Sequence, residues 1–142
     1  MYEGGYKNGK KDGFGTFYWC SEGSEGSIYK GFYKNDAPEG YGKMIWKKNY
    51  EIQSEYEGNW INNKRNGFGI YTYQNGNKYK GEFVNDQRKG FGKLICKDGD
   101  KYEGEFEDNN RKGFGIFYWK DGDKYEGEFE DRFPRPERRV RI

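Results

Sequence analysis

Residues 102–124 read YEGEFEDNNRKGFGIFYWKDGDK, and this stretch decides the fold because it is one copy of a repeat. A tyrosine followed two residues later by glycine opens each copy, at Tyr2, Tyr29, Tyr56, Tyr79, Tyr102 and Tyr125. Eleven residues after each of the first five tyrosines comes a Gly-aromatic-Gly triplet, beginning at Gly13, Gly40, Gly67, Gly90 and Gly113. Such a regular spacing indicates an array of stacked units rather than one closed globule.

Each copy has the pattern of two strands. In residues 102–106 an aromatic residue or glycine alternates with glutamate, which is typical of a strand with one solvated face. The polar residues 107–112 predict a loop, and residues 113–119 are rich in strand-forming types. Asp121-Gly122 then predicts a two-residue hairpin turn. The equivalent pairs in the two preceding copies are Asn75-Gly76 and Asp98-Gly99.

The predicted fold is all-β, an elongated single-layer antiparallel β-meander of stacked hairpin repeats. Five copies and the half copy at Tyr125 occupy residues 2–131 and predict about eleven strands. An insertion lengthens each of the first two copies, at residues 21–27 and 49–54, and we expect both to protrude at the edge between repeats. Residues 132–142 form a basic tail rich in proline and arginine.

The core of such a sheet has to be aromatic, because the chain contains a single leucine while 20% of its residues are Phe, Trp or Tyr. Gly104 lies on the same strand face as Tyr102 and Phe106. A glycine there leaves room for a ring to lie over the backbone. We therefore predict that valine in place of Gly90 or Gly115 unfolds a repeat.

The run Tyr-Glu-Gly-Glu-Phe, a polar loop, Arg-Lys-Gly-Phe-Gly and Asp-Gly resembles the MORN repeat (membrane occupation and recognition nexus). The resemblance covers residues 2 to about 131. It departs where the family often has histidine before the triplet, since this chain has Asp12, Glu39, Asn66, Lys89 and Lys112 there. The resemblance implies a β-sheet without catalytic residues, used in cytoskeletal and ciliary scaffolds such as radial spoke heads, or at membranes.

The aromatic face is the first candidate site, a trough that receives a segment of a partner protein. Its predicted lining residues are Trp19, Trp46, Trp60, Tyr71, Phe83, Phe106, Trp119 and Phe129, with Tyr6, Phe17, Tyr33 and Phe117 on the same face. Trp60 and Trp119 are the expected anchors, because an indole ring is costly to leave in water. In the alternative interpretation the rings mostly bury one another.

The second candidate is a basic edge, along which the first loops of most repeats line up. Its residues are Lys10, Lys11, Lys64, Arg65, Arg88, Lys89, Arg111 and Lys112. Such an edge suits anionic lipid or the acidic tails of proteins. The alternative is a set of solvated turns whose charges keep the sheet soluble, and Ala37-Pro38-Glu39 interrupts the row in the second repeat.

The composition argues against catalysis and cofactors. The chain has no histidine, so sites built on imidazole are excluded, and Cys20 and Cys96 do not have zinc-ligand spacing. We expect no catalytic residue, metal or cofactor. A net charge of +2, from 26 basic and 24 acidic residues, gives no general attraction to nucleic acid. The chain has no apolar run long enough to span a bilayer and no signal-peptide pattern.

These patterns together predict a non-catalytic intracellular scaffold or adaptor. We expect it to bind other proteins in a cytoskeletal assembly, the ciliary axoneme and its radial spoke head, with open sheet edges available for homo- or hetero-oligomers. The alternative is a module that binds anionic phospholipid and tethers a protein to membranes. Because Tyr2 opens a repeat directly after Met1, the possibility that the chain is a fragment of a longer protein stays open.

Overall fold

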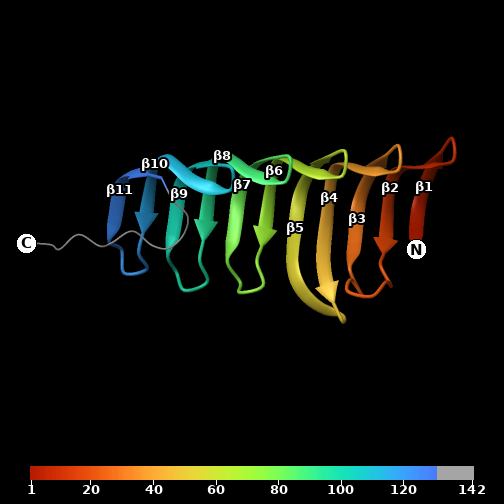
Figure 1. Ribbon diagram of the computed structural model, residues 1–142, viewed down its shortest axis with the longest axis horizontal. Coiled ribbons are helices and arrows are strands. Elements are labelled where there is room, and N and C mark those ends of the chain that lie inside the picture. The colour runs from red at the N-terminus through yellow and green to blue at the C-terminus, as the bar shows by residue number, and fades with distance from the viewer. Residues whose placement is uncertain (131–142) are drawn as a thin grey trace, which may run out of the picture.

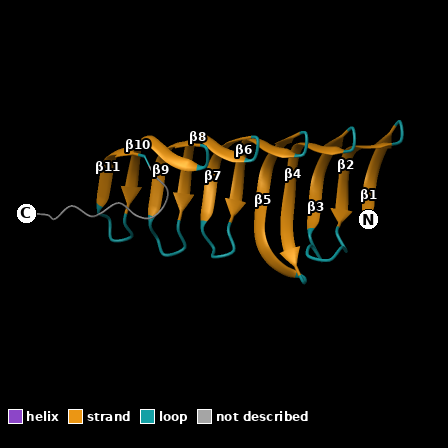
Figure 2. Ribbon diagram, in the orientation of Figure 1, coloured by secondary structure: helices purple, strands orange, loops and turns teal. Residues whose placement is uncertain are grey.

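The computed structural model describes residues 1–130. The described residues contain strands and turns but no helix (Figure 2). The eleven strands are β1 (Tyr2–Lys7), β2 (Lys10–Tyr18), β3 (Ile28–Lys34), β4 (Ala37–Lys48), β5 (Glu51–Ile61), β6 (Lys64–Thr72), β7 (Lys78–Val84), β8 (Gln87–Ile95), β9 (Lys101–Glu107), β10 (Asn110–Tyr118) and β11 (Lys124–Phe129). The predicted tail at residues 132–142 lies outside the described residues.

All eleven strands form one open sheet in sequence order, from β1 at one end to β11 at the other (Figure 1). Each strand is antiparallel to the next, so an odd-numbered and the following even-numbered strand make up one repeat. The opening glycine of each copy pairs with the last glycine of its own triplet, as Gly81 does with Gly92. The predicted all-β single-layer meander is confirmed.

The tight turns lie elsewhere than predicted. A two-residue turn connects the two strands within every repeat, at Asn8-Gly9, Asn35-Asp36, Asn62-Asn63, Asn85-Asp86 and Asp108-Asn109, and every one of these residues has a positive φ. One further two-residue turn, Asn49-Tyr50, joins β4 to β5 between two repeats. The prediction of a loop over residues 107–112 was wrong, because β10 already begins at Asn110. Asn and Asp tolerate the left-handed conformation, which a primed hairpin turn requires at both positions.

The predicted Asn-Gly and Asp-Gly turns are parts of longer connections between repeats. Asn75-Gly76 lies in residues 73–77, between β6 and β7, and only the glycine has a positive φ there. Asp98-Gly99 and Asp121-Gly122 have the same arrangement. The dipeptide pattern alone therefore does not separate a two-residue turn from a longer one that also needs one glycine.

The two insertions behave differently. The second lengthens β4 and β5 into a hairpin that projects beyond the other strands (Figure 1). The first, residues 21–27, packs against that hairpin: the Tyr50 N–H donates to the Glu25 carbonyl at 3.0 Å, and Ser27 Oγ donates to the Lys47 carbonyl at 3.1 Å. The first insertion therefore supports the projecting hairpin.

The core is a continuous row of rings on one face of the sheet, which we call the ring face. In order along the sheet the rings are Tyr2, Tyr33, Tyr29, Trp60, Tyr56, Phe83, Tyr79, Phe106, Tyr102, Phe129 and Tyr125. Each ring meets the next edge to face, with centroids 4.9 to 5.6 Å apart. Such pairs stabilise by about 0.5–1.5 kcal/mol each beyond area burial.

The tyrosines of this row that open the copies satisfy their hydroxyl groups locally. The Tyr79 hydroxyl donates to the Glu82 carbonyl at 2.9 Å, and Tyr56 and Tyr102 make the same bond three residues further along the chain. A buried hydroxyl without a partner would cost roughly 1–3 kcal/mol. This bond explains how tyrosine, rather than phenylalanine, is tolerated at full burial.

Glycine is needed at the first and at the second glycine position of the triplets for different physical reasons. A Cβ at Gly115 would lie 2.5 Å from atoms of the Tyr102 ring, so the predicted packing of a ring over glycine is present there. A Cβ at Gly90 would have only Glu82 nearby, at 3.8 Å, but Gly90 has a φ of +78°. Gly90 is therefore needed for its backbone conformation, and the prediction that it makes room for a ring was wrong.

Candidate partner-binding trough

The eight predicted trough residues all lie on the ring face, but they differ in exposure. Trp60, Phe83, Phe106, Trp119 and Phe129 are buried, whereas Trp19, Trp46 and Tyr71 are half-buried. Trp60 and Trp119 are 6% and 5% exposed, so the chain already keeps water from these two rings. These two indoles therefore need no partner to shield them from water, which was the argument for expecting them to be anchors. The half-buried indoles Trp19 and Trp46 are more accessible.

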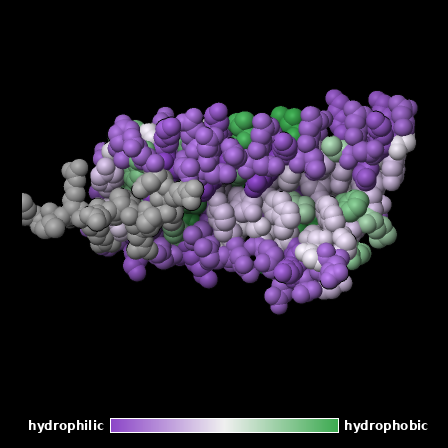
Figure 3. All heavy atoms as spheres, viewed as in Figure 1, coloured by the Kyte–Doolittle hydropathy of each residue, from purple (hydrophilic) through white to green (hydrophobic). Residues whose placement is uncertain are grey.

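The half-buried rings of Trp19 and Trp46 line a hollow of about 430 Å³ over β2 to β6. Trp19, Met44, Trp46 and Trp60 contribute apolar surface to it, and Trp46 lies 5.8 Å from Tyr71 between ring centroids. Figure 3 shows a pale band of weakly polar residues running along the sheet between two hydrophilic rims. The ring face is thus most open in the N-terminal half of the sheet.

Cationic side chains from the second position of the even-numbered strands lie over the rings. The Arg65 guanidinium carbon lies 5.9 Å from the Tyr56 centroid and 5.2 Å from that of Phe83. Arg88 stands in the same relation to Tyr79 and Phe106, at 5.7 and 5.2 Å. Arg111 lies over the rings of Tyr102 and Phe129 in the same way. In the first repeat the Lys11 ammonium lies 5.5 Å from the Tyr2 centroid.

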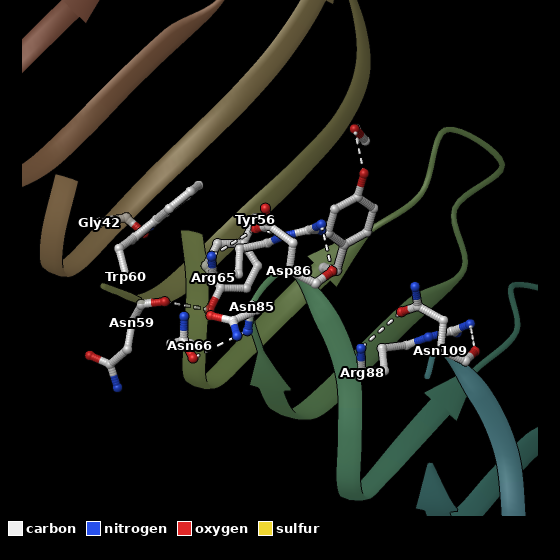
Figure 4. Close-up of polar contacts among 12 residues, drawn as sticks. Gly42, Tyr56, Asn59, Trp60, Arg65, Asn66, Asn85, Asp86, Arg88 and Asn109 are labelled. Carbon is white, nitrogen blue, oxygen red and sulfur yellow. Dashed lines mark hydrogen bonds and ion pairs between the residues drawn. The ribbon is translucent and has the colours of Figure 1, made fainter. Parts of the chain in front are cut away.

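Hydrogen bonds to the turn of the next repeat hold two of these arginines in place (Figure 4). Arg65 donates its backbone N–H and its Nε–H to Asp86 Oδ1, at 2.8 and 3.1 Å, and an Nη2–H to the Asp86 carbonyl at 2.9 Å. Arg88 donates its backbone N–H to Asn109 Oδ1 at 2.8 Å and Nη2–H to the Asn109 carbonyl. The guanidinium groups therefore connect consecutive repeats.

The predicted basic edge is consequently split between two surfaces. Lys11, Arg65, Arg88 and Arg111 belong to the ring face, and Arg111 is only 2% exposed. Exposed cations beside the two-residue turns remain at Lys10, Lys64, Lys89 and Lys112. The expectation of a single basic edge, interrupted only in the second repeat, missed this split, because strand alternation sends neighbouring residues to opposite faces.

A second set of aromatic side chains, which the sequence interpretation missed, lies on the opposite face. It consists of the central residues of the triplets together with Phe32: Phe14, Phe32, Tyr41, Phe68, Phe91 and Phe114. These side chains are 46–60% exposed. The signal was present in the sequence, since the second glycine of each triplet lies on the ring face and alternation turns the central residue before it to the opposite face.

Comparison with protein-family models agrees with this architecture. The model of the MORN repeat matches residues 2–24, 29–49, 56–78, 79–101 and 102–124. The chain belongs to the MORN-repeat family. MORN repeats are non-catalytic modules that bind proteins or membrane lipids. No curated protein matches the chain.

The titratable groups of this MORN array act as packing and bridging groups. Burial raises the pKa of Tyr29, Tyr56 and Tyr79 well above the usual value and raises the pKa of Tyr33 and Tyr102 to about 12. These tyrosines are therefore neutral hydrogen-bond donors at physiological pH.

The described part of the array offers neither a metal-binding cluster nor a membrane-spanning helix. Among residues 1–130, no group of three or more His, Cys, Asp or Glu side chains is placed to hold a metal ion. The same part of the chain contains no helix that could span a membrane. Cys20 is exposed and Cys96 is half-buried.

Proposed function

We propose that this MORN array is a non-catalytic scaffold that holds a segment of a partner protein in the hollow on its ring face. The observation that carries the proposal is the hollow of about 430 Å³, at which Trp19 and Trp46 are half-buried while Phe106, Trp119 and Phe129 further along the sheet are buried. Concave apolar surfaces with Trp and Arg side chains are where binding energy concentrates in protein interfaces.

The proposal extends to a cytoskeletal assembly, with the ciliary axoneme and its radial spoke head as the expected place. The family resemblance supports this part, because MORN arrays occur in such scaffolds. The open sheet adds a physical argument: in the described residues, β1 and β11 each pair with one neighbour only. Unpaired strand edges invite further strands from a second copy or from another protein.

Binding to anionic phospholipid is the second candidate, and the exposed lysines Lys10, Lys64 and Lys89 favour it. Each lysine near an anionic membrane contributes about 1 kcal/mol. Half of the predicted cations face the rings, however, and Lys112 pairs with Glu107 at 3.5 Å. The remaining charge is small, so a protein partner fits the surface better than a membrane does.

Fractionation of cells that make the native protein tests the two candidates. We expect the protein to stay with the insoluble cytoskeleton or axoneme after mild detergent and to leave it only in high salt. Release together with membrane markers would contradict the scaffold and support the lipid candidate. Binding of the purified chain to vesicles containing phosphatidylserine, and its loss on Lys64→Gln and Lys89→Gln, would then identify the turn edge as the lipid site.

A pair of variants tests the ring-face hollow itself. Trp46→Ala removes a half-buried ring of the hollow, whereas Phe68→Ala removes an exposed ring of the opposite face. We expect Trp46→Ala to release the protein from the insoluble fraction at lower salt and Phe68→Ala to leave its retention unchanged. Equal retention of both variants, with both folded by circular dichroism, would contradict a partner in the hollow.

A further inference from the structure

The register of the strands shows that one position of the cation row holds no cation. Arg65 pairs with Trp60, Arg88 with Phe83 and Arg111 with Phe106, each across the two-residue turn of its own repeat. In the second repeat the residue in this register is Pro38, which pairs with Tyr33. Proline therefore stands where three repeats have arginine and the first has Lys11.

The surroundings that hold an arginine elsewhere are present at Pro38. Arg65 lies between Tyr56 of its own repeat and Phe83 of the next, whose centroids are 5.2 Å apart. The equivalent rings in the second repeat are Tyr29 and Trp60, with centroids 5.6 Å apart and the same edge-to-face arrangement. We call these two rings and the turn residue Asn63 the arginine seat.

The turn residue Asn63 makes the same backbone contact with Pro38 that Asp86 makes with Arg65. The Asn63 N–H donates to the Pro38 carbonyl at 3.1 Å, as the Asp86 N–H does to the Arg65 carbonyl at 3.0 Å. Elsewhere the arginine returns hydrogen bonds from its backbone N–H and its guanidinium to the side chain and carbonyl of this turn residue. Pro38 has neither donor.

The hollow described above lies over this position. Tyr29, Pro38, Trp60 and Asn63 all line it, and it extends to the half-buried Trp46. Its charged lining is balanced, with Lys11 and Arg65 against Asp36 and Asp86. The Nε–H and an Nη2–H of Arg65 are donated to Asp86, and the carboxylates and carbonyl oxygens of the lining suit an incoming cation beside the edge of Trp60, which is 6% exposed.

We propose that the arginine seat binds the guanidinium group of an arginine from the partner protein, which lies against the edge of Trp60 beside the buried Tyr29 and donates to the Asn63 oxygens. The proposal rests on the proposed function, since it names the side chain by which the partner enters the hollow. Arginine fits better than lysine because a planar guanidinium stacks on rings and presents two donors in fixed geometry.

Titration with blocked amino acids tests the seat without a partner protein. N-acetyl-arginine amide is added to the full chain, and the indole N–H signals of Trp46 and Trp60 are followed by NMR. N-acetyl-citrulline amide has the same shape without the charge and is the control. We expect saturable shifts with arginine and binding at least about fivefold weaker with citrulline, as the loss of a cation–ring contact predicts. Equal binding, or no saturable shift with arginine, would overturn the proposal.

Two substitutions at Pro38 provide the matched variants. Pro38→Arg and Pro38→Gln both restore the backbone N–H that can donate to Asn63, but only arginine supplies a guanidinium. We expect Pro38→Arg to melt several degrees above Pro38→Gln and to weaken binding of the blocked arginine at least about tenfold, while Pro38→Gln still binds it. The same melting temperature and the same binding in both variants would contradict an arginine seat.

The outcomes also separate this inference from the proposed function. Saturable binding of the blocked arginine, combined with unchanged cytoskeletal retention of Trp46→Ala, supports the seat and contradicts the partner-binding trough. Sedimentation over a range of protein concentrations tests the source of the arginine. A dimer that Pro38→Arg abolishes would assign the arginine to a second copy and overturn the assignment to a partner protein.

Discussion

The two faces of the sheet use aromatic residues in opposite ways. Tyr79 and Phe91 belong to the same repeat, yet Tyr79 is 0% exposed and Phe91 is 60% exposed. Tyr79 lies over the backbone of Gly81 and Gly92: a Cβ at Gly92 would come 2.5 Å from its ring atoms, and one at Gly81 would come 2.6 Å from its hydroxyl oxygen. Phe91 points away from the glycines that flank it. Burial of a ring in this single layer thus depends on glycines of the same face.

High pH should break the ring face as a whole, which is the largest effect expected. Burial raises the pKa of Tyr33 and Tyr102 to about 12 and that of Tyr29, Tyr56 and Tyr79 further, against about 10 in the unfolded chain. The folded state therefore keeps protons that the unfolded state releases above about pH 10. Stability from these tyrosines is fully present below about pH 10 and is lost as the pH rises through 12 and beyond.

Circular dichroism and tyrosinate absorbance, recorded on the same samples, check this expectation. We expect β-sheet signal and protonated buried tyrosines at about pH 9, and simultaneous loss of both at more alkaline pH. The phenylalanines of the opposite face have no group that titrates, so they cannot contribute. Complete tyrosinate formation with an unchanged β-sheet signal would contradict the buried row of rings.

Removal of one ring from each face compares them directly. Tyr79→Ala leaves a cavity between Phe83 and Phe106, so we expect a loss of about 3–5 kcal/mol in the free energy of unfolding. Phe91→Ala removes an exposed ring and should change this free energy by about 0.5 kcal/mol or less. Urea denaturation measures both, and hydrogen exchange shows which repeats open, since arrays can lose cooperativity. Similar losses in both variants would contradict the comparison.

Alanine at two glycines of the same kind of triplet has smaller expected effects than the removal of a buried ring. Gly115→Ala places a Cβ 2.5 Å from atoms of the Tyr102 ring and should cost about 1–3 kcal/mol through overpacking. Gly90→Ala meets no ring, but its φ of +78° should cost about 1–2 kcal/mol. The two mechanisms are told apart in a Tyr102→Ala background.

The cost of Gly115→Ala should shrink in that background, because the ring it meets is gone, while the cost of Gly90→Ala should stay as it is. Urea denaturation of the single and double variants provides the cycle. Additive effects of Tyr102→Ala and Gly115→Ala would mean that the ring does not restrict residue 115. The cycle therefore sharpens the argument that glycine and tyrosine of the ring face act as one unit.

The strands could be predicted from the sequence, whereas the turns could be predicted only in part. Alternation over residues 102–106 predicts β9, because a period of two is the direct consequence of strand geometry. Asp98-Gly99 and Asp108-Asn109 both carry residues suited to positive φ, and the sequence interpretation placed the two-residue turn at the first pair. The pairing of β9 with β10 places it at the second.

The candidate site, too, could be predicted from the sequence only in part. The ring-face position of all eight predicted trough residues followed from alternation, but which of them are accessible did not. Trp46 and Trp60 have the same chemistry, and only the packing of neighbouring strands leaves Trp46 half-buried and covers Trp60. Arg65 and Lys64 are adjacent cations, and the strand they lie on sends only Arg65 over the rings.

The sequence by itself determined that this protein is a MORN array, because the repeat spacing, the strand alternation and the glycines are local patterns that each copy carries. The tertiary structure decided where the hollow lies. Its position depends on the register that brings Pro38 of one repeat against Tyr29, Trp60 and Asn63 from neighbouring strands. A substitution of arginine by proline is visible in the sequence, but the space that it leaves exists only between strands that pack together.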